Sequence, residues 1–100
     1  MSVAFTVENH VARVTIDRPD RMNAVDLDTE AELVRIWEAI ENDRDVRVVV
    51  LTGAGDRAFC TGADMKGTGG LSGLEYWARE RKGGFGGIAL RETLDVPVIA

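Results

Sequence analysis

Residues 45–66 read DVRVVVLTGAGDRAFCTGADMK and contain the segment on which the fold depends. Residues 46–52 are almost all apolar and β-branched, a composition typical of a strand that is covered on both faces, as in a parallel sheet. Glycine-containing turns follow directly, at residues 53–55 and 61–64. The sequence therefore predicts a buried strand that leads into turns where small residues let the backbone approach a ligand closely.

A β-hairpin is predicted near the beginning of the chain. Residues 5–8 and 11–16 are short runs rich in β-branched side chains, and Asn9 and His10 between them suit a tight two-residue turn. Pro19 ends the second run, because proline has no N–H to donate to a strand ladder.

A helix is predicted between this hairpin and the buried strand. Apolar side chains recur at helical spacing over residues 27–42, and acidic residues crowd the first turn, where the helix dipole favours them. Asp26 is one candidate for the N-cap, and Thr29 with Glu32 has the spacing of a capping box. A helix between two strands makes a crossover natural, so the predicted fold class is α/β.

The second half of the chain continues this alternation. Residues 72–82 are predicted to form a second helix, the glycines within residues 83–87 to end it, and residues 88–94 to form a short third helix. Residues 96–100 begin another apolar strand, in which the sequence stops. We therefore expect residues 1–100 to be the N-terminal part of a longer domain.

The composition restricts the possible partners. A chain of 100 residues with 45% hydrophobic and 29% charged residues is typical of one globular domain or a piece of one. The net charge is -5 and the basic residues alternate with acids, which argues against nucleic acid as a partner. Cys60 is the only cysteine and residues 1–5 lack the features of a secretion signal, so we expect a cytoplasmic protein. No apolar run approaches the roughly 20 residues that cross a membrane.

The first glycine turn has the spacing of a nucleotide-binding motif. Residues 53–58, GAGDRA, match the dinucleotide pattern G-x-G-x-x-A, and Glu75 follows about 20 residues later. That pattern has to open a helix whose N-terminus meets the pyrophosphate, whereas this turn runs into Phe59, Cys60 and a second glycine turn. A turn that simply ends the strand is therefore the favoured interpretation.

The second glycine turn, Gly62-Ala63-Asp64, has two interpretations. A glycine beside a small residue leaves backbone N–H groups free to point at an oxygen that carries negative charge, and such donors stabilise an oxyanion without any side chain. Alternatively, Gly62 only turns the chain and Asp64 only caps the next segment. On the residues alone, the second and purely structural interpretation is favoured.

Other conspicuous residues are not predicted to be catalytic. His10 is the only histidine, has no second ligand at a suitable spacing, and gives no support for a metal site. Cys60 is expected to be a small buried hydrophobe, and Trp37 to lie in the core. Trp77 and Phe85 flank the glycine cluster, where they could cover an acyl chain or anchor a loop.

Four segments, in this order, resemble the N-terminal part of the crotonase, or enoyl-CoA hydratase/isomerase, superfamily. They are the opening hairpin, DRPDRMNAVD at residues 17–26, residues 45–66, and LRETLDVPVIA at residues 90–100. The resemblance implies a crotonase-like spiral of ββα units that assembles as a homotrimer or hexamer. It also implies an acyl-CoA thioester as substrate, with no cofactor besides the coenzyme A that the substrate carries.

The resemblance also implies roles for particular residues. The backbone N–H of Ala63 would be the first donor of an oxyanion hole, and two further groups of residues would line the coenzyme site. These are Thr61, Asp64, Met65 and Lys66 on one wall, and Arg21, Met22 and Ala24 on the other. Asp64 would lie beside the coenzyme rather than act as a base.

The resemblance implies that the remaining catalytic groups lie beyond Ala100. These are the second oxyanion donor and the acid and base residues, so we expect the isolated chain to be inactive. Enoyl-CoA hydration or isomerisation is the leading hypothesis for the complete enzyme. The competing hypothesis is a non-catalytic truncated relative that binds CoA or only packs against partner chains.

Overall fold

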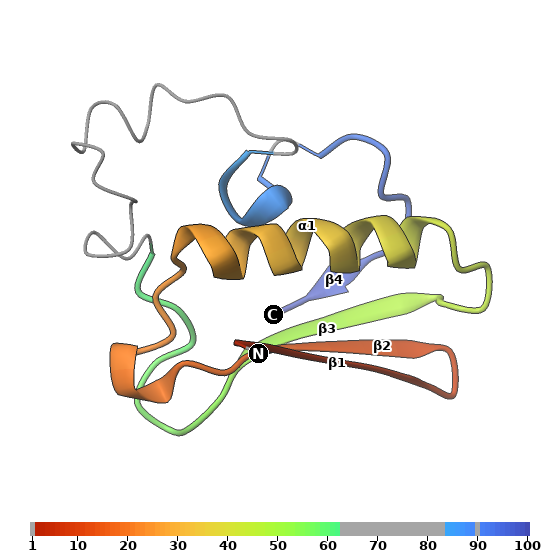
Figure 1. Ribbon diagram of the computed structural model, residues 1–100. Coiled ribbons are helices and arrows are strands. Elements are labelled where there is room, and N and C mark those ends of the chain that lie inside the picture. The colour runs from red at the N-terminus through yellow and green to blue at the C-terminus, as the bar shows by residue number, and fades with distance from the viewer. Residues whose placement is uncertain (1, 63–83, 90) are drawn as a thin grey trace.

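The computed structural model describes residues 2–62, 84–89 and 91–100, so the predicted helix at residues 72–82 lies outside the described residues. A long helix lies against one face of a small sheet (Figure 1). The elements in chain order are β1 (Val3–Glu8), β2 (Val11–Ile16), η1 (Pro19–Arg21), α1 (Leu27–Glu41), β3 (Val48–Gly53), η3 (Phe85–Gly87) and β4 (Val98–Ile99).

The predicted hairpin is confirmed. Strands β1 and β2 pair antiparallel with Val3 opposite Ile16 and Glu8 opposite Val11. Asn9 and His10 join them with φ of 51° and 68°. Two consecutive left-handed residues are what a two-residue turn needs to match the twist of the strands, and asparagine accepts that conformation more readily than most residues.

The buried strand is parallel to its neighbours, as the sequence predicts. The strand order is β1-β2-β3-β4, and β3 pairs parallel with both β2 and β4. Helix α1 is the crossover between β2 and β3. The carboxyl ends of β2 and β3 therefore meet at one edge of the sheet, where the loops that follow them can form a site.

Helix α1 begins and packs as its sequence pattern predicts. Asp26 is the N-cap, and its Oδ1 accepts a hydrogen bond of 2.8 Å from the N–H of Thr29. The apolar stripe of the helix packs on β2 and β3 and forms the core, in which Trp37 is 1% exposed. The core residues are Val3, Ala12, Val14, Ile16, Val25, Leu33, Trp37, Ile40, Val46 and Val49.

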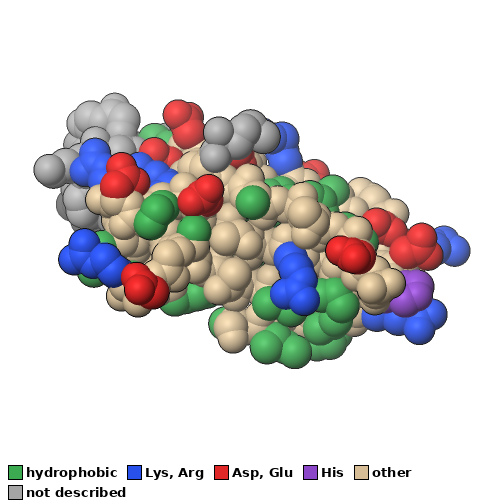
Figure 2. Space-filling model, turned by 90° about the horizontal axis from the view of Figure 1, so that it is seen from below, with side chains coloured by type: hydrophobic (Ala, Val, Ile, Leu, Met, Phe, Trp, Pro, Cys, Tyr) green, Lys and Arg blue, Asp and Glu red, His purple; other side chains and the backbone are tan. Residues whose placement is uncertain are grey.

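The sequence predicts that β3 is covered on both faces of the sheet, and the described residues cover one of them. In the described part of the chain, α1 lies on one face, and the opposite face is seen in Figure 2 with hydrophobic side chains at its surface. Val48 and Val50 of β3 are half-buried, and Ile99, which pairs with Val50, is 58% exposed.

The prediction of a helix over residues 88–94 is wrong for the residues described. A single 3₁₀ turn at Phe85–Gly87 precedes irregular chain. The reason is tertiary, since Arg91 pairs with Glu41 of α1 at 3.1 Å and Thr93 Oγ1 donates to Oε2 of the same glutamate at 2.5 Å. Just before this range, the N–H of Gly86 donates to Glu30 Oε1 at 2.8 Å, and its carbonyl accepts from Trp37 Nε1 at 2.9 Å. Contacts with α1 therefore fix the conformation of this segment and override its local tendency.

Gly87 fits against α1 only because it has no side chain. A Cβ at this position would lie 2.7 Å from Cγ2 of Val34 and 3.2 Å from Cδ1 of Trp37. Further along, Arg91 donates from Nε to the Gly87 carbonyl and pairs with both carboxylate oxygens of Glu41 at 3.1 Å. The glycine segment is thus attached to α1 along its length.

Candidate functional site: two loops at the carboxyl edge of the sheet

The loops that follow β2 and β3 lie side by side at one end of the molecule (Figure 1). The first spans residues 17–26 and contains η1, and the second spans residues 54–62. These loops include the described members of both walls that the sequence resemblance implies. The contacts between the loops therefore decide the geometry of the candidate site.

The carboxamide of Asn23 joins the two loops. Asn23 is 1% exposed, and its Oδ1 accepts from the N–H of Arg18 at 2.9 Å within its own loop. Its Nδ2 donates across to the carbonyls of Ala54 at 2.9 Å and Ala58 at 2.7 Å. A buried carboxamide needs such partners, and here they are all backbone atoms of the site.

Met22 and Asn23 are held in an unusual backbone conformation. Their φ angles are 53° and 58°, in the left-handed region. Asparagine tolerates this region, but an unbranched apolar residue gains nothing from it, and Met22 is 40% exposed. Strained backbone of this kind is concentrated at functional sites, where the surrounding contacts enforce it.

A backbone bridge completes the connection between the loops. The N–H of Val25 donates to the carbonyl of Gly62 at 2.8 Å. Gly62 has φ of 106°, which an L side chain rarely adopts, so a glycine is required there. The bridge fixes the carbonyl of Gly62, the first residue of the Gly62-Ala63-Asp64 turn.

Charged groups stabilise the first loop from within. Arg18 donates from Nη1 to the carbonyl of Ala24, and its Nη2 lies 3.3 Å from Oδ2 of Asp26. Partial burial favours the neutral acid, but the hydrogen bonds from Thr29 and the charge of Arg18 outweigh it and hold the pKa of Asp26 below 3.8. The carboxylate therefore stabilises both the helix start and the loop.

We expect Asp26→Asn to destabilise the protein at neutral pH by about 0.5 to 1 kcal/mol, because the N-cap is kept while the charge beside Arg18 and the helix N-terminus is lost. The lowered pKa means that this contribution is present above the unfolded value near 3.8 and is lost as the pH falls through the folded value. Urea midpoints of both proteins at neutral pH and at about pH 3 measure the difference. A difference that does not shrink at the acidic pH would contradict the assignment.

The predicted site residues are described only in part. Arg21 and Met22 are exposed, and so is Thr61 on the second loop. Ala24 is buried, and its N–H donates to the carbonyl of Arg21 at 3.0 Å. Ala63, Asp64, Met65 and Lys66 lie outside the described residues, so their predicted roles remain predictions.

The turn after β3 does not have the form of a dinucleotide-binding loop. Residues 54–62 make bends and open no helix in the described chain. They border an open depression of about 340 Å³, lined by Thr52, Gly53, Gly55, Asp56, Arg57, Ala58 and Phe59. The structure therefore supports the interpretation that residues 53–58 form a turn that ends the strand.

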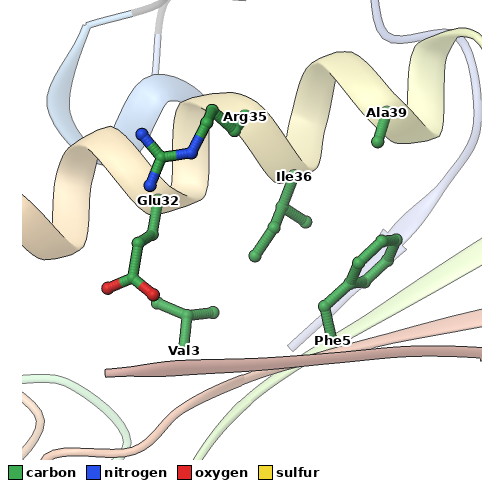
Figure 3. Close-up of a pocket in the computed structure, with 6 residues that line it drawn as sticks. All are labelled: Val3, Phe5, Glu32, Arg35, Ile36 and Ala39. Atoms are coloured by element: carbon green, nitrogen blue, oxygen red, sulfur yellow. The ribbon is translucent and has the colours of Figure 1, made fainter. Parts of the chain in front are cut away.

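A second hollow, of about 350 Å³, lies between β1 and α1. Val3 and Phe5 reach it from the strand, and Glu32, Arg35, Ile36 and Ala39 from the helix (Figure 3). The Glu32 carboxylate accepts a 2.6 Å hydrogen bond from the Ser2 hydroxyl. None of these residues belongs to the loops after β2 and β3, so we do not assign the hollow to the site.

His10 and Cys60 have ordinary local partners. His10 is exposed, and its Nδ1 lies 2.8 Å from the carbonyl of Asp45. Cys60 is half-buried, and its Sγ accepts from the N–H of Gly62 at 3.4 Å. Among the residues that the structure describes, no three His, Cys, Asp or Glu side chains form a group that could hold a metal ion.

Sequence reasoning missed Asn23 and Arg18 as residues that organise the site. Asn23 stands between Met22 and Ala24, both of which were assigned to the coenzyme wall. An asparagine in a loop is a usable signal, because its side chain bonds backbone groups and its backbone tolerates positive φ. Its two partners in the second loop lie 31 and 35 residues away, which no local pattern reveals.

The comparisons with known proteins agree on one family. The sequence profile described as enoyl-CoA hydratase/isomerase matches residues 6–100. The (E)-benzylidenesuccinyl-CoA hydratase of Thauera aromatica is 53% identical over 66 residues, which are 66% of this chain and 26% of that enzyme. The short-chain-enoyl-CoA hydratase of Clostridium acetobutylicum is 39% identical across 99% of this chain and 38% of its own length.

Solved structures lead to the same family. The crystal structure of carnitinyl-CoA hydratase from Mycobacterium avium matches with a TM-score of 0.82 and 36% identity, over 97% of this chain and 36% of that protein. The chain belongs to the enoyl-CoA hydratase/isomerase family, in the crotonase superfamily, and its mixed sheet and helix form part of the crotonase fold. It spans between 26% and 38% of the length of the two sequence relatives described above. In the described part of the chain, no helix is long and apolar enough to cross a membrane.

Proposed function

We propose that these residues are the N-terminal part of an acyl-CoA enzyme that stabilises a negatively charged thioester oxygen, with enoyl-CoA hydration or isomerisation as its reaction. The observation that carries the proposal is the 2.8 Å hydrogen bond from Val25 to the carbonyl of Gly62. The names of the relatives support the substrate class, since those described above act on CoA thioesters. The mechanism follows from the direction of the Gly62 peptide.

The peptide bond that joins Gly62 to Ala63 is suited to present a donor. In a trans peptide the C=O and the N–H point in opposite directions. Because the Gly62 carbonyl is held by Val25, a trans peptide here would direct the following N–H away from the first loop. A fixed backbone N–H of this kind stabilises developing negative charge without reorganisation, which is the principle of an oxyanion hole.

The two loops would then bind the coenzyme on either side of this donor. We assign Arg21, Met22 and Ala24 to one wall and Thr61, Asp64, Met65 and Lys66 to the other. The strained backbone at Met22 supports this assignment, because it leaves a large apolar side chain exposed next in sequence to Asn23, which joins the two loops.

The remaining parts of the enzyme are proposed to follow these residues. The short coverage of the relatives supports a longer protein, in which later segments supply the second donor and the acid and base groups. We further propose that the complete enzyme is a cytoplasmic homotrimer or hexamer. It would need no cofactor besides the coenzyme A of its substrate.

A pair of proteins tests the proposal. A protein extended to the length of the relatives should hydrate or isomerise short enoyl-CoA thioesters, followed by the loss of ultraviolet absorbance of the conjugated thioester. The 100-residue chain alone should show no turnover, because the proposal assigns one donor and the proton-transfer groups to later segments.

Two results would contradict the proposal in different ways. If the extended protein neither binds CoA in calorimetric titration nor turns over thioesters, a non-catalytic packing module is the better description. If the 100-residue chain alone has activity that scales with its concentration, the assignment of the missing groups to later segments is wrong.

A further inference from the structure

The side chain of Asn23 occupies a fully determined position between the two loops. Both protons of Nδ2 are donated to backbone carbonyls, those of Ala54 and Ala58, while Oδ1 accepts from the N–H of Arg18. The partners leave no ambiguity about which atom is the oxygen and which the nitrogen, because a flipped carboxamide would place oxygen against two carbonyls. The contact is therefore specific to a carboxamide.

The surrounding backbone is shaped to admit this carboxamide. A Cβ on Gly53 would lie 2.5 Å from Nδ2 of Asn23 and 2.1 Å from the carbonyl oxygen of Phe59, so only glycine leaves the necessary room. Asn23 itself has φ of 58°, in the region that asparagine tolerates. The missing side chain at Gly53 and the left-handed backbone at Asn23 thus both accommodate this carboxamide.

We infer that Asn23 is a positioning residue, whose carboxamide holds the turn after β3 against the loop after β2 and so sets the direction of the Gly62 carbonyl. The link between them is short in the chain. Val25, which donates to Gly62, lies two residues after Asn23, and Ala58, which accepts from Asn23, lies four residues before Gly62. The consequence for turnover rests on the proposed function, whereas the consequence for the Val25 bridge does not.

Two substitutions separate the carboxamide from the backbone that carries it. Asn23→Gly removes all three side-chain hydrogen bonds, and glycine adopts φ of 58° without strain. Asn23→Asp keeps the size and one acceptor, but the ionised group repels the carbonyls of Ala54 and Ala58. Asn42→Asp is the matched control, because Asn42 also donates from Nδ2 to a carbonyl, that of Glu38 at 2.9 Å, at the far end of α1.

The first readout is amide hydrogen exchange at Val25, which needs no substrate. We expect exchange at Val25 to be at least about tenfold faster in Asn23→Gly than in wild type, while the amide of Leu33 in the middle of α1 is unchanged. The control Asn42→Asp should leave Val25 as in wild type. Unchanged exchange at Val25 would overturn the inference, and so would an equal increase at Leu33, since Asn23 would then serve general stability.

The second readout is turnover as a function of pH in the complete protein. The new carboxyl group in Asn23→Asp can donate only when protonated, so its kcat should be about tenfold below wild type at alkaline pH and recover as the pH falls. Asn42→Asp should follow the wild-type profile. A folded Asn23→Asp protein with the wild-type profile would overturn the inference. An inactive wild type would instead refute the proposed function and leave the exchange result to decide on Asn23.

Discussion

An Ala63→Pro variant of the complete protein is expected to fold and bind CoA, yet to turn over enoyl-CoA thioesters about 10² to 10³ times more slowly than wild type, a loss of roughly 2.7 to 4 kcal/mol in transition-state stabilisation. Proline deletes the amide hydrogen that the peptide after Gly62 is proposed to present. The carbonyl of Gly62 remains available to Val25, so the bridge between the loops can persist. Steady-state kcat and KM, with CoA affinity from calorimetry, measure the effect.

Ala63→Ser is the matched control, because it keeps the amide hydrogen at a small steric change. Its kcat should stay within about tenfold of wild type. Proline also restricts the residue before it, so folding of the variant is checked by circular dichroism. A folded Ala63→Pro protein that turns over normally would show that this amide is not the donor.

The second large effect is expected in the core. Trp37→Ala should lower the free energy of unfolding by about 3 to 5 kcal/mol. Trp37 is 1% exposed, and its Nε1 donates to the carbonyl of Gly86, so the substitution opens a cavity and also leaves a buried carbonyl without its partner. Urea unfolding followed by circular dichroism measures the change.

Two further variants separate the contributions of Trp37. Trp37→Phe keeps an aromatic ring but loses the N–H, so we expect a smaller loss of about 1 to 3 kcal/mol. Val7→Ala, at a side chain that is 41% exposed, should change stability by less than about 1 kcal/mol. If Trp37→Ala has the urea midpoint of wild type, Trp37 is not the centre of the core.

Short-range sequence patterns predicted the elements whose conformation depends on residues close by in the sequence. The turn at Asn9 and His10 and the parallel strand β3 are each specified by neighbouring residues, and both are confirmed. Of the two candidate helix starts, Asp26 is the N-cap and Thr29 lies inside the helix. The prediction of a helix at residues 88–94 is wrong, because Glu41 of α1 binds Arg91 and Thr93. Helix α1 also holds Gly86, just before this range, through side chains that lie far away in the sequence. Hydrogen bonds over 49 and 56 residues have no counterpart in a local pattern.

The sequence predicted which two loops form the candidate site, but it did not predict the hydrogen bonds that hold these loops together. The resemblance to the crotonase superfamily assigned Met22 and Thr61 to opposite walls, and the structure brings the loops that carry them together. Asn23 joins the loops by donating to backbone carbonyls 31 and 35 residues away, and the sequence does not show which carbonyls these are. The role of a side chain that bonds only main chain is therefore visible only in three dimensions.

The most direct test of the central claim is the vibrational frequency of the thioester carbonyl in a bound enoyl-CoA analogue, measured by isotope-edited infrared spectroscopy. A fixed N–H that stabilises negative charge on this oxygen also polarises the carbonyl in the ground state. We therefore expect the C=O stretch to move to lower frequency on binding to the complete protein, and most of the shift to be lost in Ala63→Pro but kept in Ala63→Ser. A bound carbonyl with the same frequency in wild type and Ala63→Pro would contradict the claim that the peptide after Gly62 supplies the donor.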